Sequence, residues 1–303
     1  MAEKLLFIVN PAAGQKRVAG YLSEILQVFC AHGYLPTVLM TERAGHAADL
    51  AREYAGDYDL VACAGGDGTL NETISGVLAS GSNALIAYLP CGTTNDLANT
   101  LGLNRQLPQA ALDAVNGEER SLDIGEFNGR SFVYTASFGA FTKAAYGTPQ
   151  SVKNALGHLA YVLEGVKSLG DIKPVHARVR TDEGDFEGDY IFGSVSNTTS
   201  LAGIITLDKE RVMLDDGKFE LMLVDMPTDV LEMGKLLLQV TQAKFGDMLL
   251  MSHASRIDIE TDTDTDWTLD GEFAKGANDF HIRNLNKAVR IRVPRNDTAT
   301  IGG

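Results

Sequence analysis

The chain has 303 residues, of which 45% are hydrophobic, and this is enough apolar material for the cores of two domains. Its formal net charge of −14 argues against binding to nucleic acid and against a broad polybasic membrane surface. No apolar run approaches the roughly 20 residues that span a bilayer, so we expect any membrane contact to be peripheral.

Two further features of the composition favour the cytoplasm. The three cysteines, Cys30, Cys63 and Cys91, are scattered and lack the spacing of metal ligands. Unpaired thiols of this kind are typical of a reducing compartment. The first four residues lead directly into an apolar strand, and no signal peptide is visible. We therefore expect a cytoplasmic protein.

Strands and helices alternate over the first hundred residues. Apolar runs predict four strands, at residues 5–9, 35–40, 60–64 and 84–89. Helical periodicity predicts helices between and after them, at residues 18–32, 46–54, 70–78 and from about 96 to 101. This alternation favours a parallel sheet with crossover helices, and such sheets bind ligands at the carboxyl ends of their strands. Four polar turns follow those ends, at Asn10, Thr41, residues 65–69 and residues 92–96.

The turn after the third strand carries the strongest local signal. Gly65, Gly66 and Gly68 interrupt the apolar run just before a helical pattern. Glycines let the backbone approach a ligand closely, and the free N–H groups of such a turn attract phosphate. Asp67 inside the loop would repel phosphate unless a divalent cation lies between them or the carboxylate handles a proton. The alternative is an ordinary turn in an α/β sheet.

The second part of the chain has a different pattern. From residue 121 onward, short runs with alternating apolar and polar residues predict half-buried antiparallel strands. They are expected at residues 121–125, 132–136, 175–181, 190–195, 219–224, 257–261 and 289–293. Two apolar stripes predict helices at residues 152–169 and 229–245, the second with Thr228 as its N-cap. The alternating Thr and Asp residues at 261–266 are expected on the solvent face of a strand.

Five motifs in this order resemble the soluble diacylglycerol kinase and lipid kinase family. They are Asn10-Pro11 with Gly14, Gly65-Gly66-Asp67-Gly68-Thr69, Pro90-x-Gly92-Thr93-x-Asn95-Asp96, Asp215-Asp216-Gly217 and Asp270-Gly271-Glu272. The Gly-Gly-Asp-Gly-Thr motif is shared with NAD kinases and phosphofructokinases, whereas the block at residues 90–96 makes the resemblance specific. The resemblance covers nearly the whole chain.

The resemblance implies a fold and a reaction. It implies an ATP-binding α/β domain followed by a β-sandwich domain with two or more helices. The change of pattern places the boundary near Leu122, so the domains are expected at residues 1–122 and 123–303, and the last residues are expected to pack back on the first domain. The resemblance also implies ATP and Mg²⁺ as cofactors and a lipid alcohol at a membrane surface as acceptor. With diacylglycerol as that acceptor, the product is phosphatidic acid.

The same resemblance assigns nucleotide contacts. The residues expected to contact ATP are Asn10, Gly14, Thr41, Gly65, Gly66, Asp67, Gly68, Thr69, Leu70, Asn71, Gly92, Thr93 and Asn95. Thr41 has the weakest signal, because a hydroxyl at a strand end can equally satisfy the backbone.

Two metal sites are implied. Asp67, Asp96 and Asp123 would surround the catalytic Mg²⁺, partly through water, because Mg²⁺ dehydrates reluctantly. Asp96 can instead be an acid at a helix N-terminus, and Asp123 a plain carboxylate between domains. A structural metal would be held by the carboxylate of Asp216 and the carbonyls of Met213 and Lys218. A type I turn at Asp216-Gly217 explains the same residues without metal.

The acceptor hydroxyl needs a base, and Asp270 and Glu272 are the expected catalytic pair. In an extended strand the two carboxylates would face the same side. Gly271 makes a turn an alternative. We favour Asp270 as the base, with Glu272 as its partner or replacement. The alternative, in which the two carboxylates have no catalytic role, is a solvated hairpin turn.

Two competing functions remain open from the residues alone. An NAD kinase-like small-molecule kinase shares the glycine loop, and a nucleotide-binding regulator would lack turnover. The acceptor lipid and the oligomeric state are also open, with a homodimer as one candidate.

Overall fold

The computed structural model describes residues 2–93, 95–139, 173–197, 200–201, 205–206, 213–241 and 246–295. The chain divides into two compact units. Unit 1 comprises Met1–Leu122 and the segment that begins at Lys287, and unit 2 comprises Asp123–Asn286. The predicted helix at residues 152–169 lies outside the described residues. None of the helices in the described ranges is long and apolar enough to cross a membrane.

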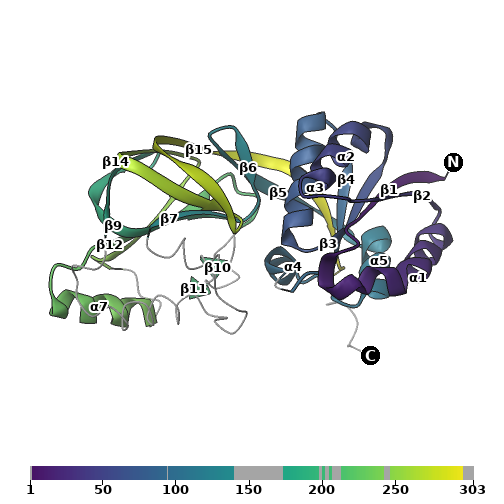
Figure 1. Ribbon diagram of the computed structural model, residues 1–303, viewed down its shortest axis with the longest axis horizontal. Helices are drawn as coiled ribbons and strands as arrows, with labels where there is room; N and C mark the ends of the chain where they lie inside the picture. Colours follow the sequence, from purple (N-terminus) through teal and green to yellow (C-terminus); the bar gives the residue numbers. More distant parts are fainter. Residues whose placement is uncertain are drawn as a thin grey trace, which may run out of the picture. The chain divides into compact units, whose positions relative to one another are not determined.

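Unit 1 contains a parallel sheet with the order β2-β1-β3-β4 (Figure 1). Its strands are β1 (Glu3–Val9), β2 (Tyr34–Met40), β3 (Leu60–Gly65) and β4 (Leu85–Pro90). Its helices are η1 (Ala13–Lys16), α1 (Arg17–Ala31), α2 (His46–Tyr54), η2 (Ala55–Asp57), α3 (Asp67–Ser80), α4 (Asp96–Leu101) and α5 (Leu107–Asn116). The alternation predicted for this part of the chain is thus present, and α5 is an additional helix.

The two faces of this sheet are covered by different helices. Phe7 of β1 packs edge-on against Phe29 of α1, with ring centroids 5.4 Å apart, in a core that also includes Leu107 of α5. The alternate residues of β1 point to the other face, where α2 contacts β1 and α3 contacts β3 and β4 (Figure 1). Because the strands are parallel, the loops after β1, β3 and β4 emerge at the same edge.

Unit 2 is built on antiparallel strands. They comprise the end of β5 (Glu118–Phe127), β6 (Arg130–Phe132), β7 (Thr135–Gly139), β8 (Val175–Thr181), β9 (Asp185–Ser196), β12 (Phe219–Asp225), β13 (Leu249–Ala254), β14 (Arg256–Leu269) and the first part of β15 (Glu272–Val293). The short strands β10 (Ser200–Leu201) and β11 (Ile205–Thr206) pair with each other. The main order is β13-β12-β9-β7-β14-β15, and β8 pairs with both β9 and β14. The long strands β14 and β15 form one hairpin. The sequence predicted only two short, separate strands within it, at residues 257–261 and 289–293.

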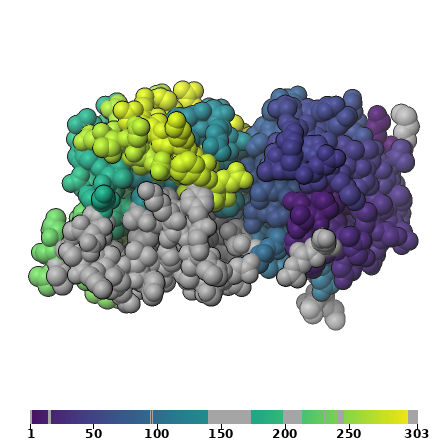
Figure 2. Space-filling view, viewed as in Figure 1, coloured from purple at the N-terminus to yellow at the C-terminus, as the bar shows by residue number. Residues whose placement is uncertain are grey.

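The core of unit 2 surrounds a buried tryptophan. Trp267 is 1% exposed, and its ring lies 4.9 Å from Phe127, 4.8 Å from Phe138 and 5.2 Å from Phe280 between centroids. On the outside, Asp262 and Asp264 of β14 are exposed, as predicted, but Thr263 between them is exposed as well, because the pairing register with β15 shifts between Glu260 and Thr265. The yellow and yellow-green atoms of β14 and β15 lie along the upper part of this unit in Figure 2.

The last described helix differs from its prediction at the N-cap. Helix α7 spans Val230–Thr241, and residues 242–245 of the predicted helix lie outside the described residues. Oδ1 of Asp229 accepts the N–H of Glu232 at 2.8 Å, and Glu232 accepts the N–H and hydroxyl of Thr228, each at 2.7 Å. The cap is therefore Asp229 and not Thr228, because Asp229 accepts the free N–H of the third helical residue, whereas the hydroxyl of Thr228 donates to Glu232.

Candidate functional site

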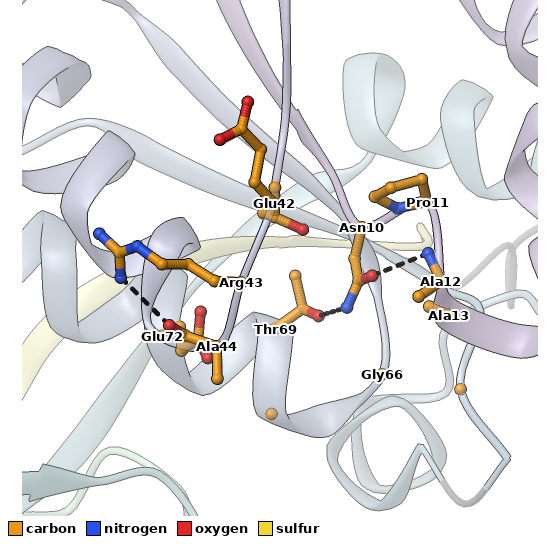
Figure 3. A pocket seen from close by; sticks show the side chains of 13 residues that line it. Asn10, Pro11, Ala12, Ala13, Glu42, Arg43, Ala44, Gly66, Thr69 and Glu72 are labelled. Atoms are coloured by element: carbon orange, nitrogen blue, oxygen red, sulfur yellow. Dashed lines mark hydrogen bonds between the residues drawn. The ribbon is translucent and has the colours of Figure 1, made fainter.

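A pocket of about 560 Å³ lies at the carboxyl edge of the parallel sheet in unit 1 (Figure 3). It is lined by Asn10, Pro11, Ala12, Ala13, Thr41, Glu42, Arg43, Ala44, Gly66, Gly68, Thr69, Glu72 and Gly92. Six of these, Asn10, Thr41, Gly66, Gly68, Thr69 and Gly92, were predicted nucleotide contacts. Its volume is in the range of small-molecule sites.

The start of α3 forms one wall of the pocket. Gly66 is the N-cap of α3, and no side chain caps this end. The first-turn amides of a helix have no partner within the helix, and the helix dipole adds positive potential there. An uncapped helix N-terminus of this length that borders a pocket is therefore suited to an anionic group.

Gly92 and Gly14 allow the loops to approach closely. A Cβ on Gly92 would lie 2.6 Å from Cα of Gly66, closer than a carbon atom can approach. Gly14 has φ +56°, and its Cβ would lie 1.9 Å from the carbonyl oxygen of Cys91. Glycine is thus required at both positions by packing, and at Gly14 also by the backbone conformation.

Asn10 connects the loop after β1 to α3. Its Nδ2 donates to Oγ1 of Thr69 at 3.0 Å, and its Oδ1 accepts the N–H of Ala12 at 3.0 Å (Figure 3). The backbone N–H of Asn10 also continues the ladder to Ala64 at 2.9 Å. Asn10 therefore fixes the relative positions of two walls of the pocket.

Some predicted contacts lie away from the pocket. Asn95 is 2% exposed; its Nδ2 donates to the carbonyl of Gly92 at 2.8 Å, and its Oδ1 accepts from Tyr88 at 3.0 Å. Leu70 is buried, and Asn71 accepts a hydrogen bond from Ser75. Gly14, Gly65, Asp67 and Thr93 are likewise outside the lining. Asn95 therefore shapes the loop that carries Gly92.

Glu72 is a lining residue that the sequence did not indicate. Its carboxylate accepts the N–H groups of Gly45 at 2.8 Å and Ala47 at 3.1 Å, which lie at the N-terminus of α2. Gly45, the N-cap of α2, has no capping side chain of its own. A helix start without a capping side chain of its own needs a hydrogen-bond acceptor from elsewhere in the chain. This requirement was the sequence signal that could have indicated an acceptor such as Glu72. Glu72 thereby holds the turn of Thr41, Glu42 and Arg43 beside α3.

Two of the predicted ligands of the catalytic metal, Asp67 and Asp96, belong to unit 1, and the third, Asp123, belongs to unit 2. Asp67 is the first residue of α3 and is half-buried, and Asp96 is the first residue of α4. Asp123 in unit 2 is fully buried; its carboxylate accepts hydrogen bonds from Gly217 N, Asn284 Nδ2 and Asn286 Nδ2 at 2.6, 3.3 and 3.0 Å. No cluster of three or more His, Cys, Asp or Glu side chains suited to a metal occurs within the described ranges.

The loop of Met213, Asp216 and Lys218 adjoins Asp123. Oδ1 of Asp216 accepts the N–H of Lys218 at 3.0 Å, and Gly217 has φ +82°, which differs from the negative φ of a type I turn centred on Asp216-Gly217. Beside the loop, Oδ1 of Asn197 and Oδ1 of Asn284 are buried and have no hydrogen-bond partner in the described part of the chain. Unpartnered carboxamide oxygens next to a carboxylate are chemically suited to a hard cation and its water shell.

Asp270 and Glu272 occupy the β14–β15 hairpin. Leu269 pairs with Glu272, and Asp270 and Gly271 between them have φ +49° and +85°, which defines a two-residue turn. Of the two alternatives that the sequence left open, an extended strand and a turn at Gly271, the turn is present: Asp270 lies in it, whereas Glu272 begins β15 and is exposed.

The carboxylate of Asp270 is held by backbone amides. It accepts hydrogen bonds from the N–H groups of Val133, Tyr134 and Thr135 at 2.6, 2.9 and 2.9 Å. Burial raises the pKa of Asp270 to about 6, although the three amide hydrogen bonds act in the opposite direction. Asp270 thus anchors the turn that carries Glu272 to the segment before β7.

Comparisons with known proteins identify the family. Residues 4–127 match the model of the diacylglycerol kinase catalytic domain. The chain is 31% identical over 295 residues to a diacylglycerol kinase of Bacillus subtilis (strain 168), covering 95% of each chain. It is 30% identical over 294 residues to a diacylglycerol kinase of Staphylococcus haemolyticus (strain JCSC1435), covering 95% of this chain and 87% of that one.

A solved structure shares the fold. A diacylglycerol kinase of Bacillus anthracis str. Sterne superposes with a TM-score of 0.74 at 23% identity, covering 98% of both chains. A glycine loop, an uncapped helix and a pocket at a sheet edge are the features of a phosphate-binding α/β enzyme. The chain belongs to the diacylglycerol kinase family. It is accordingly a lipid kinase, which confirms the predicted class of enzyme.

Proposed function

We propose that the protein transfers the γ-phosphate of ATP to the hydroxyl group of a lipid alcohol such as diacylglycerol, giving phosphatidic acid. The single observation that carries this proposal is the pocket at the uncapped N-terminus of α3, in a chain of the diacylglycerol kinase family. Phosphoryl transfer needs mainly alignment and charge neutralisation, and a helix N-terminus beside a glycine loop supplies both for phosphate oxygens.

In this proposal the residues of unit 1 hold the nucleotide. The amides of residues 65–71 and the loop of Gly92 and Thr93 bind the phosphates. Thr41, Glu42 and Arg43 line the same pocket and border the nucleotide. Asn10 and Asn95 act by shaping the loops, because their amide groups are used within the protein. Gly14 allows the close approach of the loop to Cys91.

Mg²⁺ fits the donor set of this site. Asp67 is a carboxylate on the phosphate-binding loop, and carboxylate oxygen is a ligand that Mg²⁺ accepts together with water and phosphate. Asp96 and Asp123 complete the proposed set through water. When bound, Mg²⁺ neutralises charge on the transferring phosphate. The residues Met213, Asp216 and Lys218 are proposed to hold a second, structural ion, which the unpartnered oxygens of Asn197 and Asn284 support.

We propose that a carboxylate of the β14–β15 hairpin accepts the proton of the lipid hydroxyl. A lipid hydroxyl is a weak nucleophile until a base accepts its proton. Asp270 has three amide hydrogen bonds and is half-buried, whereas Glu272 is exposed at the adjacent strand start. This favours Glu272 as the base, with Asp270 fixing its position, which reverses the preference from sequence.

The remaining expectations accompany this proposal. An enzyme with this acceptor works in the cytoplasm and touches the membrane surface transiently. Residues 1–122 act as the ATP-binding domain, and residues 123–303 as a β-sandwich domain for the lipid. A homodimer is compatible with all of these.

The test is transfer of label from γ-labelled ATP to a panel of acceptors. Diacylglycerol, monoacylglycerol and a sphingoid base are presented in mixed micelles, and NAD is presented in solution. We expect labelled phosphatidic acid from diacylglycerol, and no transfer after chelation of divalent cations. Label in NAD alone would show a small-molecule kinase. ATP binding without transfer to any acceptor would show a regulator.

A further inference from the structure

Glu220 of β12 is a buried carboxyl group outside the machinery proposed above. It is 4% exposed, and its Oε2 has no hydrogen-bond partner among the residues that the structure describes. Its neighbours in the strand, Phe219 and Leu221, are fully buried. A buried polar atom without a partner lowers the stability of the folded state. The position therefore requires an explanation that packing does not give.

The side chain of Glu220 points away from the core of unit 2. Phe219 and Leu221 belong to the core cluster around Trp267, and successive residues of a strand point to opposite faces. Glu220 therefore lies on the second face of the sheet. Two residues further along the same face, Met222 is apolar and fully buried. An apolar side chain at position 220 would thus suit the folded protein better than a carboxyl group.

A second unpartnered polar group lies beside Glu220. In the sheet register Glu220 of β12 is opposite Ser196 of β9, and Ser196 is in turn opposite Thr135 of β7. Residues opposite each other in neighbouring strands project to the same face. Ser196 is fully buried, and its Oγ also lacks a partner in the described ranges. Two adjacent strands thus present two unsatisfied polar groups side by side.

This row of residues reaches the turn that carries the proposed base. The N–H of Thr135 donates to Oδ1 of Asp270 at 2.9 Å, which anchors the turn before Glu272. Neighbouring strands are about 4.8 Å apart, so Glu220 lies two strands, roughly 10 Å, from Thr135. The glycerol oxygens and ester groups of a lipid lie somewhat closer than this to its free hydroxyl, and the side chains of Glu220 and Ser196 project to the same face as Thr135.

We propose that Glu220 and Ser196 bind the oxygen-rich glycerol region of the acceptor lipid, a proposal that rests on the lipid kinase function above. The carboxyl group and the hydroxyl can together accept and donate hydrogen bonds, as hydroxyl and ester oxygens require. A ligand would satisfy the two atoms that the protein leaves without partners. Buried polar groups that conflict with packing are expected at such functional positions. Glu220 is then a specificity residue and does not take part in proton transfer.

The test measures lipid binding and stability in the same variants. The dissociation constant of dioctanoylglycerol is determined by calorimetry without ATP, and KM values for lipid and ATP are measured separately. We expect Glu220→Met to weaken lipid binding roughly tenfold, as loss of a hydrogen-bonding group predicts, with an unchanged KM for ATP. The same variant should melt about 3 °C higher, because an unsatisfied group has been removed.

Three further variants make the result specific. Glu220→Gln retains hydrogen-bonding atoms and should restore binding to within a few-fold of wild type. Ser196→Ala should weaken binding severalfold. Thr265→Val is the matched control: Thr265 is a buried hydroxyl of the same unit whose Oγ1 already donates to Thr263. It should lower stability and leave lipid binding unchanged.

Lipid binding within twofold of wild type in Glu220→Met would overturn the proposal, and so would a fall in its melting temperature, which would reveal a structural partner. A changed response of the melting temperature to chelation, with unchanged lipid binding, would assign Glu220 to the nearby metal loop instead. Failure of the wild type to phosphorylate lipid contradicts only the proposed function, because the binding comparison does not depend on turnover.

Discussion

The side-chain amide of Asn10 donates to the hydroxyl of Thr69 over 3.0 Å, and this hydrogen bond links the loop after β1 to the first turn of α3. The two residues are 59 positions apart in the chain, yet both line the same pocket. The link sets the width of the pocket at the point where phosphate is proposed to bind.

Loss of this link should affect nucleotide binding more than folding. We expect Asn10→Ala to raise the KM for ATP about tenfold, while the free energy of unfolding falls by about 1 kcal/mol, the usual net value of a hydrogen bond. Thr69→Val should have a similar effect. In a double-mutant cycle the two changes should couple by about 1 kcal/mol in ATP binding. Additive effects would show that the two side chains act independently.

Removal of the carboxylate of Asp67 should abolish turnover. The expected loss in kcat for Asp67→Ala is on the order of 10³-fold or more, because the cation that neutralises the phosphate loses a ligand. The melting temperature should stay close to that of wild type. Asp185→Asn, at an exposed carboxylate that begins β9, is the control and should be fully active. Activity of Asp67→Ala within tenfold of wild type would contradict the assignment.

The two carboxylates of the hairpin should respond differently to amide substitution. We expect Glu272→Gln to lower kcat by on the order of 10²- to 10⁴-fold without loss of ATP binding, as removal of a general base does. Asp270→Asn should lower kcat about tenfold and destabilise the fold, because an amide cannot accept all three backbone N–H groups. Near-normal turnover in Glu272→Gln together with an inactive Asp270→Asn would assign the base to Asp270.

The raised pKa of Asp270 predicts a pH dependence of stability. Its folded-state pKa of about 6 lies above the ordinary value of 3.8, so the native state binds the proton more tightly than the unfolded state. The stabilisation from this group is complete below about pH 3.8 and is lost as the pH rises through about 6. Denaturant titrations at several pH values should therefore show wild type losing stability relative to Asp270→Asn between pH 4 and about 6.5. A constant difference between the two proteins over this range would contradict the prediction.

Removal of divalent cations should lower stability through the loop of Asp216. A bound ion stabilises the folded state by about 2.7 kcal/mol when its concentration is a hundredfold above Kd. We expect a chelator to lower the melting temperature of wild type but not that of Asp216→Ala. Asp185→Asn should respond as wild type does. Equal sensitivity of wild type and Asp216→Ala would place the ion elsewhere.

The sequence predicted most of the parallel sheet and six of the pocket residues because both depend on local patterns. Apolar runs and glycine turns each lie within a few positions, and parallel strands bring their ends together. The environment of Asp270 could not be predicted in this way. Its partner Val133 is 137 positions away, and Glu72 binds Gly45 across 27 positions. Such contacts depend on the tertiary structure, and no local periodicity reports them.

The strand β15 has a consequence for the order of folding during synthesis. Its last part pairs with β4 through Ile291 and Ile86, and Arg292 donates to the carbonyl of Gly117 at 2.9 Å, so one edge of the parallel sheet is completed by residues near 290. A ribosome makes these residues after all of unit 2. Until then β4 is an open edge with unpaired backbone groups, a state prone to pairing with other chains. Residues 1–122 released alone should therefore aggregate, and addition of a peptide of residues 287–295 should restore solubility.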